Sequence, residues 1–485
     1  MTVIPLWLGL SALFGHPHPR PPLAAERIEL QPCHVAGVPV EIRCGTYSVY
    51  EDRVHRRGRR IPLFVRVIPS SAPSPARDPF VLVSTGGPGT TNSEVVPFAY
   101  ARGWANDRDV VLVDLRGTSG PSPDRLDCDL PGSPAEPLGY LQNVFDTAVV
   151  ARCRTELEKR ADLTQYTTAN AMDDLYDALV ALGYRQANLF GVSGGTREVL
   201  EFMRRHPAMA RSAILEGVAP VSFKNPLPHA SAAQEALDSL FAQCERDAPC
   251  AQAFPKLRTE FARLRETANR HPVAASVPPA FSGRSGREAT VELSWPMIAE
   301  TIRTMSYTVG GGRSIPFVIH QASLGDYVPL IEAGVQSSRR TKGAIRFGFL
   351  LSQTCLEDVP RISNAEVARE TANTYLGDTR VRQQQAACRQ WVHGAAPLGN
   401  ADSSPVRSDI PVFILSGTID PVTRPRFAAD AARYLPHSSH VIAPGGHVPA
   451  GSCVDAMERQ FLEAPTRPVD TSCVKSMTLP AFRIR

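Results

Sequence analysis

Residues 187–203 constrain the fold more than any other part of this chain. An apolar run at 187–191 leads into Gly191-Val192-Ser193-Gly194-Gly195, and apolar residues then recur at helical spacing over 199–203. Small residues between a strand and a helix allow a sharp turn in which two backbone segments come close together. An ordinary turn of small residues would give the same local pattern, so its meaning depends on what the rest of the chain supplies.

Short apolar runs without polar alternation occur on both sides of this segment. They lie at 79–84, 109–115, 212–218, 411–416 and 440–443, and amphipathic helical patterns lie at 171–182, 426–435 and 454–462. Such runs suit strands that are buried on both faces of a parallel sheet. Strands interleaved with helices predict an α/β fold with a mostly parallel central sheet and helices on both faces.

The rhythm changes after Val221, where residues up to about 400 are typical of helices and loops. A chain of 485 residues has room for a core and a large insertion. We therefore expect a core in two parts, at 26–220 and 401–485, with a mainly helical insertion at 221–400.

The charge balance bears on possible partners. The formal net charge is +4, which argues against nucleic acid as the main partner. A basic run at 53–60 is interpreted as a solvated hairpin turn rather than a binding patch.

The first 25 residues predict a signal peptide. An apolar stretch at 4–14 is too short to span a bilayer, and Leu23-Ala24-Ala25 precedes a possible cleavage site. No stable membrane anchoring is expected, and the protein is expected to be secreted or periplasmic. The alternative is a tail rich in proline and histidine.

Ten cysteines support export. None forms a C-x-x-C pair, so a zinc site is not expected. Neighbours in sequence suggest the pairs Cys33–Cys44, Cys128–Cys153, Cys244–Cys250, Cys355–Cys388 and Cys453–Cys473, although spacing alone does not fix the connectivity. Such disulfides require an oxidising compartment, whereas ten reduced cysteines would suit a cytosolic enzyme.

Three residues are candidates for nucleophilic catalysis. A serine hydroxyl is a poor nucleophile until a histidine, itself oriented by a carboxylate, takes its proton. Ser193, Asp420 and His447 occur in the order Ser, Asp, His, and each follows a predicted strand. Individually, Asp420 could be a turn residue and His447 a loop histidine. Their order and placement together predict a catalytic triad.

An oxyanion hole requires backbone N–H donors. One is expected from Gly194, the residue after the nucleophile, and the other from the loop Gly86-Gly87-Pro88-Gly89, with Gly87 as the donor. The loop lacks the Lys-Ser/Thr ending of a phosphate-binding loop. No metal or organic cofactor is implied.

These motifs together carry a family resemblance. The loop Gly86-Gly87-Pro88-Gly89, the stretch Asp114-x-Arg116-Gly117-Thr118-x-Gly120, the Ser193 motif and the Asp420 and His447 segments resemble the proline iminopeptidase and tripeptidyl aminopeptidase family of α/β-hydrolases. The resemblance covers most of 80–220 and 405–465. It implies an α/β-hydrolase fold with a helical cap, and removal of residues from peptide N-termini through an acyl-enzyme. Gly194 stands where many relatives carry an aromatic residue.

An aminopeptidase must also recognise a cationic N-terminus, which a carboxylate does well. Glu357, Asp358 and Glu216 are the candidates, although the first two also fit an exposed acidic loop. The predicted partners are peptide substrates. A carboxylesterase on the same fold, or a binding protein that has lost catalysis, are the alternatives.

Overall fold

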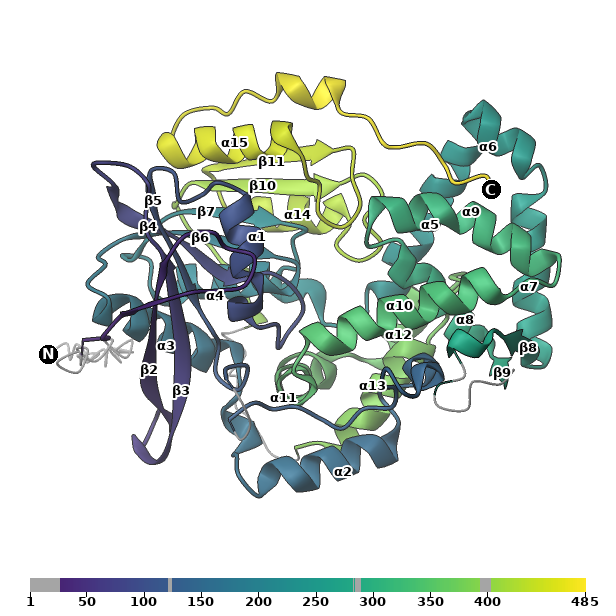
Figure 1. Ribbon diagram of the computed structural model, residues 1–485, viewed down its shortest axis with the longest axis horizontal. Coiled ribbons are helices and arrows are strands. Elements are labelled where there is room, and N and C mark those ends of the chain that lie inside the picture. Colours follow the sequence, from purple (N-terminus) through teal and green to yellow (C-terminus); the bar gives the residue numbers. More distant parts are fainter. Residues whose placement is uncertain (1–26, 121–123, 282, 284–288, 393–402) are drawn as a thin grey trace, which may run out of the picture.

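A nine-stranded sheet forms the centre of the molecule. The computed structural model describes residues 27–120, 124–281, 283, 289–392 and 403–485 (Figure 1), so the predicted signal peptide lies outside the described residues. The strands are β1 (Gln31–Cys33), β2 (Ile42–Asp52), β3 (Arg57–Ile68), β4 (Ala76–Ser84), β5 (Arg108–Val113), β6 (Ala187–Val192), β7 (Ala210–Glu216), β10 (Val412–Gly417) and β11 (Ser438–Ala443). Their order is β1-β2-β3-β5-β4-β6-β7-β10-β11. The six strands from β5 to β11 in this order are parallel, and the other three are antiparallel.

Both faces of the parallel strands are buried. Alternate residues of each strand point to two different cores: Leu189 packs with α3 (Thr168–Ala181), α4 (Gly194–Arg205) and α14 (Pro425–Ala432), whereas Phe190 packs with α1 (Val96–Ala101) and α15 (Ser452–Glu463). Burial on both faces explains why the strands are uniformly apolar. The predicted α/β fold with a mostly parallel sheet is confirmed.

The basic run at 53–60 does form the turn of a hairpin, between β2 and β3. Its first arginine is not solvated as expected. The guanidinium of Arg53 contacts Asp174 and Asp177 on α3, because the hairpin folds back over that helix.

The interval between β7 and β10, here called the cap region, is mainly helical. It contains α5 (His229–Arg246), α6 (Ala248–Ala253), α7 (Leu257–Arg270), α8 (Trp295–Met305), α9 (Val309–Ser323), α10 (Val328–Ala344), α11 (Phe347–Glu357), α12 (Asn364–Thr371) and α13 (Thr379–Gln390), with a hairpin of β8 (Val273–Val277) and β9 (Ala289–Leu293). Figure 1 shows most of these helices, in teal and green, beside the sheet. They have a hydrophobic core of their own.

The last part of the cap region packs on the main core instead. Phe349 and Leu351 of α11, and Trp391 after α13, are buried in the same cluster as the sheet and α2 (Thr147–Glu158). The Cys355–Cys388 disulfide joins α11 to α13. These two helices are therefore anchored to the core, which fixes the side chains they present.

All five predicted disulfides are present, and they suit an oxidising compartment. Within the described residues, no helix is both long and apolar enough to cross a membrane.

Candidate active site

Ser193 lies at the sharp turn between β6 and α4. Its backbone has φ 57° and ψ −122°, a conformation that non-glycine residues rarely adopt. The Ser193 N–H donates to the Glu216 carbonyl oxygen at 2.9 Å. A Cβ atom placed on Gly195 would lie 2.1 Å from the Ser84 carbonyl oxygen, so only glycine lets the helix start this close to β4. The turn predicted from the sequence is thus strained and tightly packed.

His447 and Asp420 form a buried pair. The His447 Nδ1 atom lies 2.9 Å from Asp420 Oδ2, and the Asp420 carboxylate also accepts hydrogen bonds from Val422 N–H, Thr423 N–H and the Thr423 hydroxyl at 2.6–2.9 Å. A carboxylate at Nδ1 favours the tautomer in which Nε2 can accept a proton. His447 Nε2 is buried and has no hydrogen-bond partner among the described residues.

The three predicted triad residues follow neighbouring strands. Ser193 follows β6, Asp420 follows β10 and His447 follows β11, and these strands belong to one parallel run. Carboxyl ends of parallel strands share one edge of a sheet, where such folds place reactive groups. A Cβ atom on Gly217, directly after β7, would lie 3.2 Å from His447 Cε1. Because β7 lies between β6 and β10, the imidazole is next to the strand that adjoins Ser193.

The glycine-rich loop after β4 packs against the start of α4. Gly195 N–H donates to the Gly86 carbonyl oxygen at 3.1 Å. A Cβ atom on Gly194 would lie 2.9 Å from that oxygen and 3.3 Å from Gly87 Cα. Gly194 therefore leaves no space for the aromatic residue that relatives carry. As the first residue of α4, it also has an N–H without an intrahelical acceptor.

Asn92 holds this loop in place. Its buried side-chain amide donates to three carbonyl oxygens at the ends of β4 and β5, at 2.8–3.1 Å. The next residue, Ser93, donates through its N–H and hydroxyl to Asp114, both at 2.7 Å. Burial raises the pKa of Asp114 to about 6. The first residue of the Asp114–Gly120 motif thus anchors the loop rather than facing substrate.

Arg116, the third residue of that motif, is fully buried and fully paired. It binds Asp174 with two hydrogen bonds, at 2.8 and 3.0 Å, and donates to the carbonyl oxygens of Glu51 and Gln165 at 3.0 and 2.8 Å. The motif therefore connects the β2–β3 hairpin to α3.

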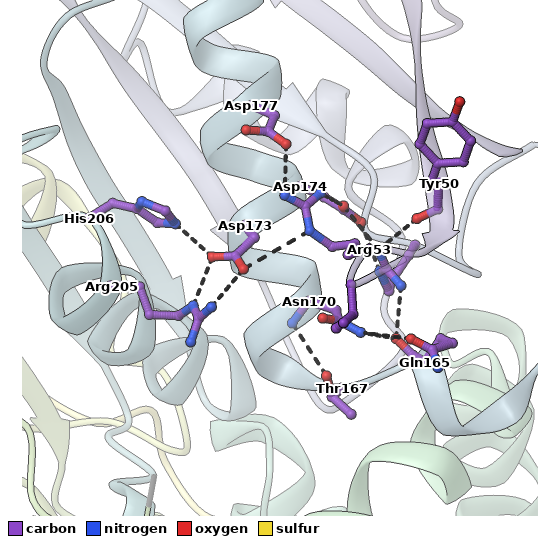
Figure 2. A network of polar contacts seen from close by, with 12 residues as sticks. Tyr50, Arg53, Gln165, Thr167, Asn170, Asp173, Asp174, Asp177, Arg205 and His206 are labelled. Carbon is purple, nitrogen blue, oxygen red and sulfur yellow. Dashed lines mark hydrogen bonds and ion pairs between the residues drawn. The ribbon is translucent and has the colours of Figure 1, made fainter. Parts of the chain in front are cut away.

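Figure 2 shows the wider network around the acidic face of α3. Arg53 reaches Asp174 and Asp177, while Asp173 accepts from Arg205 at 2.6–2.8 Å and lies 2.9 Å from His206 Nε2. Each carboxylate in this network has a cationic partner, so the network is structural.

Glu357 and Asp358, the candidates for binding the substrate N-terminus, form hydrogen bonds and ion pairs inside the protein. Glu357 accepts from the Thr168 N–H and hydroxyl at 2.6 and 2.7 Å, and Arg197 pairs with both acids, at 3.4 and 2.7 Å. Both carboxylates are buried at the end of α11, every residue of which is buried. Because recognition of an amine needs an accessible carboxylate, this geometry argues against the predicted role.

Glu216 is also internal. It lies on the face of β7 that packs under α15, with Glu458 and Arg102 as its charged neighbours, and burial raises its pKa well above the usual value. At the turn the molecule uses the Glu216 carbonyl oxygen, which accepts from Ser193, and not its carboxylate.

Cap residues that the sequence did not single out surround His447. The Tyr307 ring packs edge-on against the imidazole at 5.1 Å, and the Tyr307 carbonyl oxygen accepts from the His447 N–H at 3.2 Å. Arg303 donates to the Tyr307 hydroxyl at 2.8 Å and binds Glu300 with two further hydrogen bonds. His229 is buried nearby, and burial lowers its pKa well below the usual value. No motif marks these residues: Glu300, Arg303 and Tyr307 come from α8 and the turn after it, whereas His229 begins α5.

Comparison with known proteins gives one family match and several distant structural likenesses. A family model described as TAP-like protein matches residues 373–473, the part that contains Asp420 and His447. No curated protein matches the chain significantly. Solved structures that resemble it include the proline iminopeptidase of Mycobacterium smegmatis (15% identity, 87% of this chain and 98% of that chain covered, TM-score 0.43) and a thermophilic esterase from Thermogutta terrifontis (14% identity, 87% and 99% covered, TM-score 0.36).

Likeness at these identities and scores carries no argument about substrate. The family match confirms the resemblance to TAP-like α/β-hydrolases over residues 373–473, and the sheet topology is that of an α/β-hydrolase fold.

Proposed function

We propose that this chain is a serine exopeptidase that hydrolyses peptide bonds near a free N-terminus. The observation that carries the proposal is the buried His447–Asp420 pair, with an unpartnered His447 Nε2, at the sheet edge that also bears the strained Ser193. The TAP-like match over the same segment favours a peptidase. The five disulfides support a secreted or periplasmic location, because such bonds persist in oxidising compartments.

In the proposed reaction, Ser193 Oγ attacks the scissile carbonyl carbon while His447 Nε2 takes the hydroxyl proton. Asp420 keeps the imidazole oriented and stabilises the imidazolium that forms. The N–H groups of Gly87 and Gly194 bind the oxyanion. His447 then protonates the leaving amine. In the second half of the reaction, His447 takes a proton from water, which attacks the acyl-enzyme, and His447 returns the proton to Ser193 Oγ.

Labelling with a fluorophosphonate tests the nucleophile directly. The native chain should be labelled at one serine, and Ser193→Ala should abolish both labelling and turnover while the protein stays folded. Ser222→Ala is the matched control, because that exposed serine lies at the base of the cap region. Labelling of Ser193→Ala equal to that of the native chain would refute the assignment.

A carboxylesterase remains the alternative, because the three carboxylates predicted to bind an amine are all internal. Comparing an aminoacyl-amide with its N-acetylated form separates the two activities. A peptidase that recognises the N-terminus should lose most of its kcat/KM on acetylation, whereas an esterase should be indifferent to it.

A further inference from the structure

Arg380, at the start of α13, has no acceptor for its buried Nη1 atom among the described residues. Its guanidinium lies over the Phe145 ring, 4.0 Å from the centroid, and its Nη1 atom is buried. Among the described residues, none forms a hydrogen bond or an ion pair with it. Phe145 itself packs against Phe347 of α11 at 5.2 Å, so the platform beneath the guanidinium is fixed.

The Arg380 charge lies in the cluster that surrounds His447. Arg380 interacts electrostatically with Glu300, Arg303 and Tyr307, and His229 interacts with both Arg380 and His447. Tyr307 in turn contacts the His447 ring. The platform beneath the guanidinium also adjoins the glycine-rich loop: Phe347, which packs on Phe145, follows Arg346, whose N–H donates to the Gly89 carbonyl oxygen at 2.9 Å.

The cluster carries an excess positive charge. The two carboxylate oxygens of Glu300 are both bound by Arg303, at 2.5 and 2.8 Å, so those charges offset each other. His229 is held neutral at pH 7, since burial lowers its pKa. Burial also lowers the pKa of Arg380, to about 10, which leaves it charged at neutral pH. One positive charge thus has no internal counter-ion.

Three polar atoms in this cluster lack hydrogen-bond partners. Arg380 Nη1, His229 Nδ1 and His447 Nε2 are all buried and lack a hydrogen-bond partner among the described residues. Native structures rarely leave such atoms unsatisfied, because each loses its hydration without compensation. A bound molecule that supplies acceptors would satisfy the Arg380 Nη1 donor, and a guanidinium favours a carboxylate, which it can bind with two parallel hydrogen bonds.

We infer that Arg380 binds a carboxylate of the substrate and gives the site a preference for acidic peptides. This inference rests on the proposed function, since it assigns a substrate class to the same site. The carboxylate belongs either to an acidic side chain or to the C-terminus of a short peptide. In both cases the Arg380 guanidinium positions the substrate while Phe145 supports the guanidinium from below.

Equilibrium binding to the Ser193→Ala protein tests this without turnover. Four pairs of tripeptides are compared by calorimetry. Three pairs are amidated at the C-terminus and differ by Glu or Gln at one position, and the fourth is trialanine as free acid or amide. The acidic member of at least one pair should bind about 10–100-fold more tightly, which is the usual worth of a charged hydrogen bond. The position of that pair identifies the source of the carboxylate.

Arg380→Gln should abolish that preference, and Arg380→Lys should retain part of it. The matched control is Arg382→Gln, two residues further along α13, where an exposed arginine pairs with Asp378. Equal binding within all four pairs, or a preference that survives Arg380→Gln, would overturn the inference. A preference without fluorophosphonate labelling of Ser193 would instead refute the proposed hydrolase and leave the carboxylate site in place.

Discussion

Two arginines in this molecule, Arg116 and Arg380, differ in how their guanidinium groups are satisfied. Arg116 is fully buried, whereas Arg380 is half-buried with a buried Nη1 atom. Arg116 is satisfied by Asp174 and by backbone carbonyl oxygens of two separate segments. Arg380 has an aromatic ring beneath it and no acceptor among the described residues. The Arg116 guanidinium therefore needs no ligand to satisfy its donors, whereas the Arg380 guanidinium does.

The difference separates a structural charge from a binding charge. Removing one partner from a complete buried pair leaves an uncompensated charge, so its cost falls on folding. A cation that has no internal partner already lowers the stability of the free protein. Replacing this cation should therefore change substrate binding more than the free energy of unfolding. Asp174, Asp420 and Asp114 allow this contrast to be tested at three further positions.

The largest effect is expected at Asp420, a carboxylate that is fully paired but lies in the site. Asp420→Asn should lower kcat by about 10,000-fold, because an amide no longer favours the His447 tautomer with a free Nε2. This corresponds to about 5.5 kcal/mol in the activation barrier. The measurement is kcat of Asp420→Asn and of the native chain, on any substrate that the native chain cleaves.

A matched variant is Asp430→Asn, a half-exposed carboxylate on α14 that pairs with Arg433, which should retain native kcat. If Asp420→Asn lost stability but kept its turnover per folded molecule, Asp420 would belong with the structural charges. The proposed triad would then be wrong.

The next effect is expected at Asp174, where the pair is complete and far from the reacting groups. Asp174→Ala should lower the free energy of unfolding by about 3–5 kcal/mol, because Arg116 stays buried without a counter-ion. Turnover per folded molecule should be unchanged. Urea denaturation followed by fluorescence gives the first quantity, and active-site titration with a fluorophosphonate gives the second.

Asp177→Ala serves as the control, since this carboxylate is partly exposed and pairs with Arg53. This variant should lower the free energy of unfolding by no more than about 1 kcal/mol, which is the usual contribution of a partly exposed ion pair. If Asp174→Ala and Asp177→Ala lowered the free energy of unfolding equally, the burial of Arg116 would not increase the contribution of its ion pair to stability.

Some of these residues could be predicted from the sequence and others could not. Ser193, Asp420 and His447 were found because each follows a strand, and strand ends are encoded locally by apolar runs. Glu357 was proposed to bind the substrate amine, but it is buried and paired at the end of a helix whose other residues are almost all apolar or small. Arg303, Tyr307 and Arg380 carry no local signal, because α8 and α13 come together only through the packing of the cap region. A contact of that kind depends on tertiary structure, which no single-sequence pattern records.

The smallest effect concerns Asp114, which shares a motif with Arg116 but accepts from Ser93 and, among the described residues, forms no ion pair. Burial raises its pKa to about 6 from 3.8, so the folded chain holds a proton that the unfolded chain has released between these values. A raised carboxyl pKa stabilises the fold fully below pH 3.8, and this contribution is lost as the pH rises to about 6. Relative to Asp114→Asn, the native chain should therefore lose about 2–3 kcal/mol of unfolding free energy across this range and none above it. Urea titrations at pH 4, 5, 6 and 7 measure the difference, with the exposed Asp107→Asn as the matched control. A difference that stayed constant with pH would show that Asp114 is ionised throughout, and that Ser93 alone is enough to hold its charge.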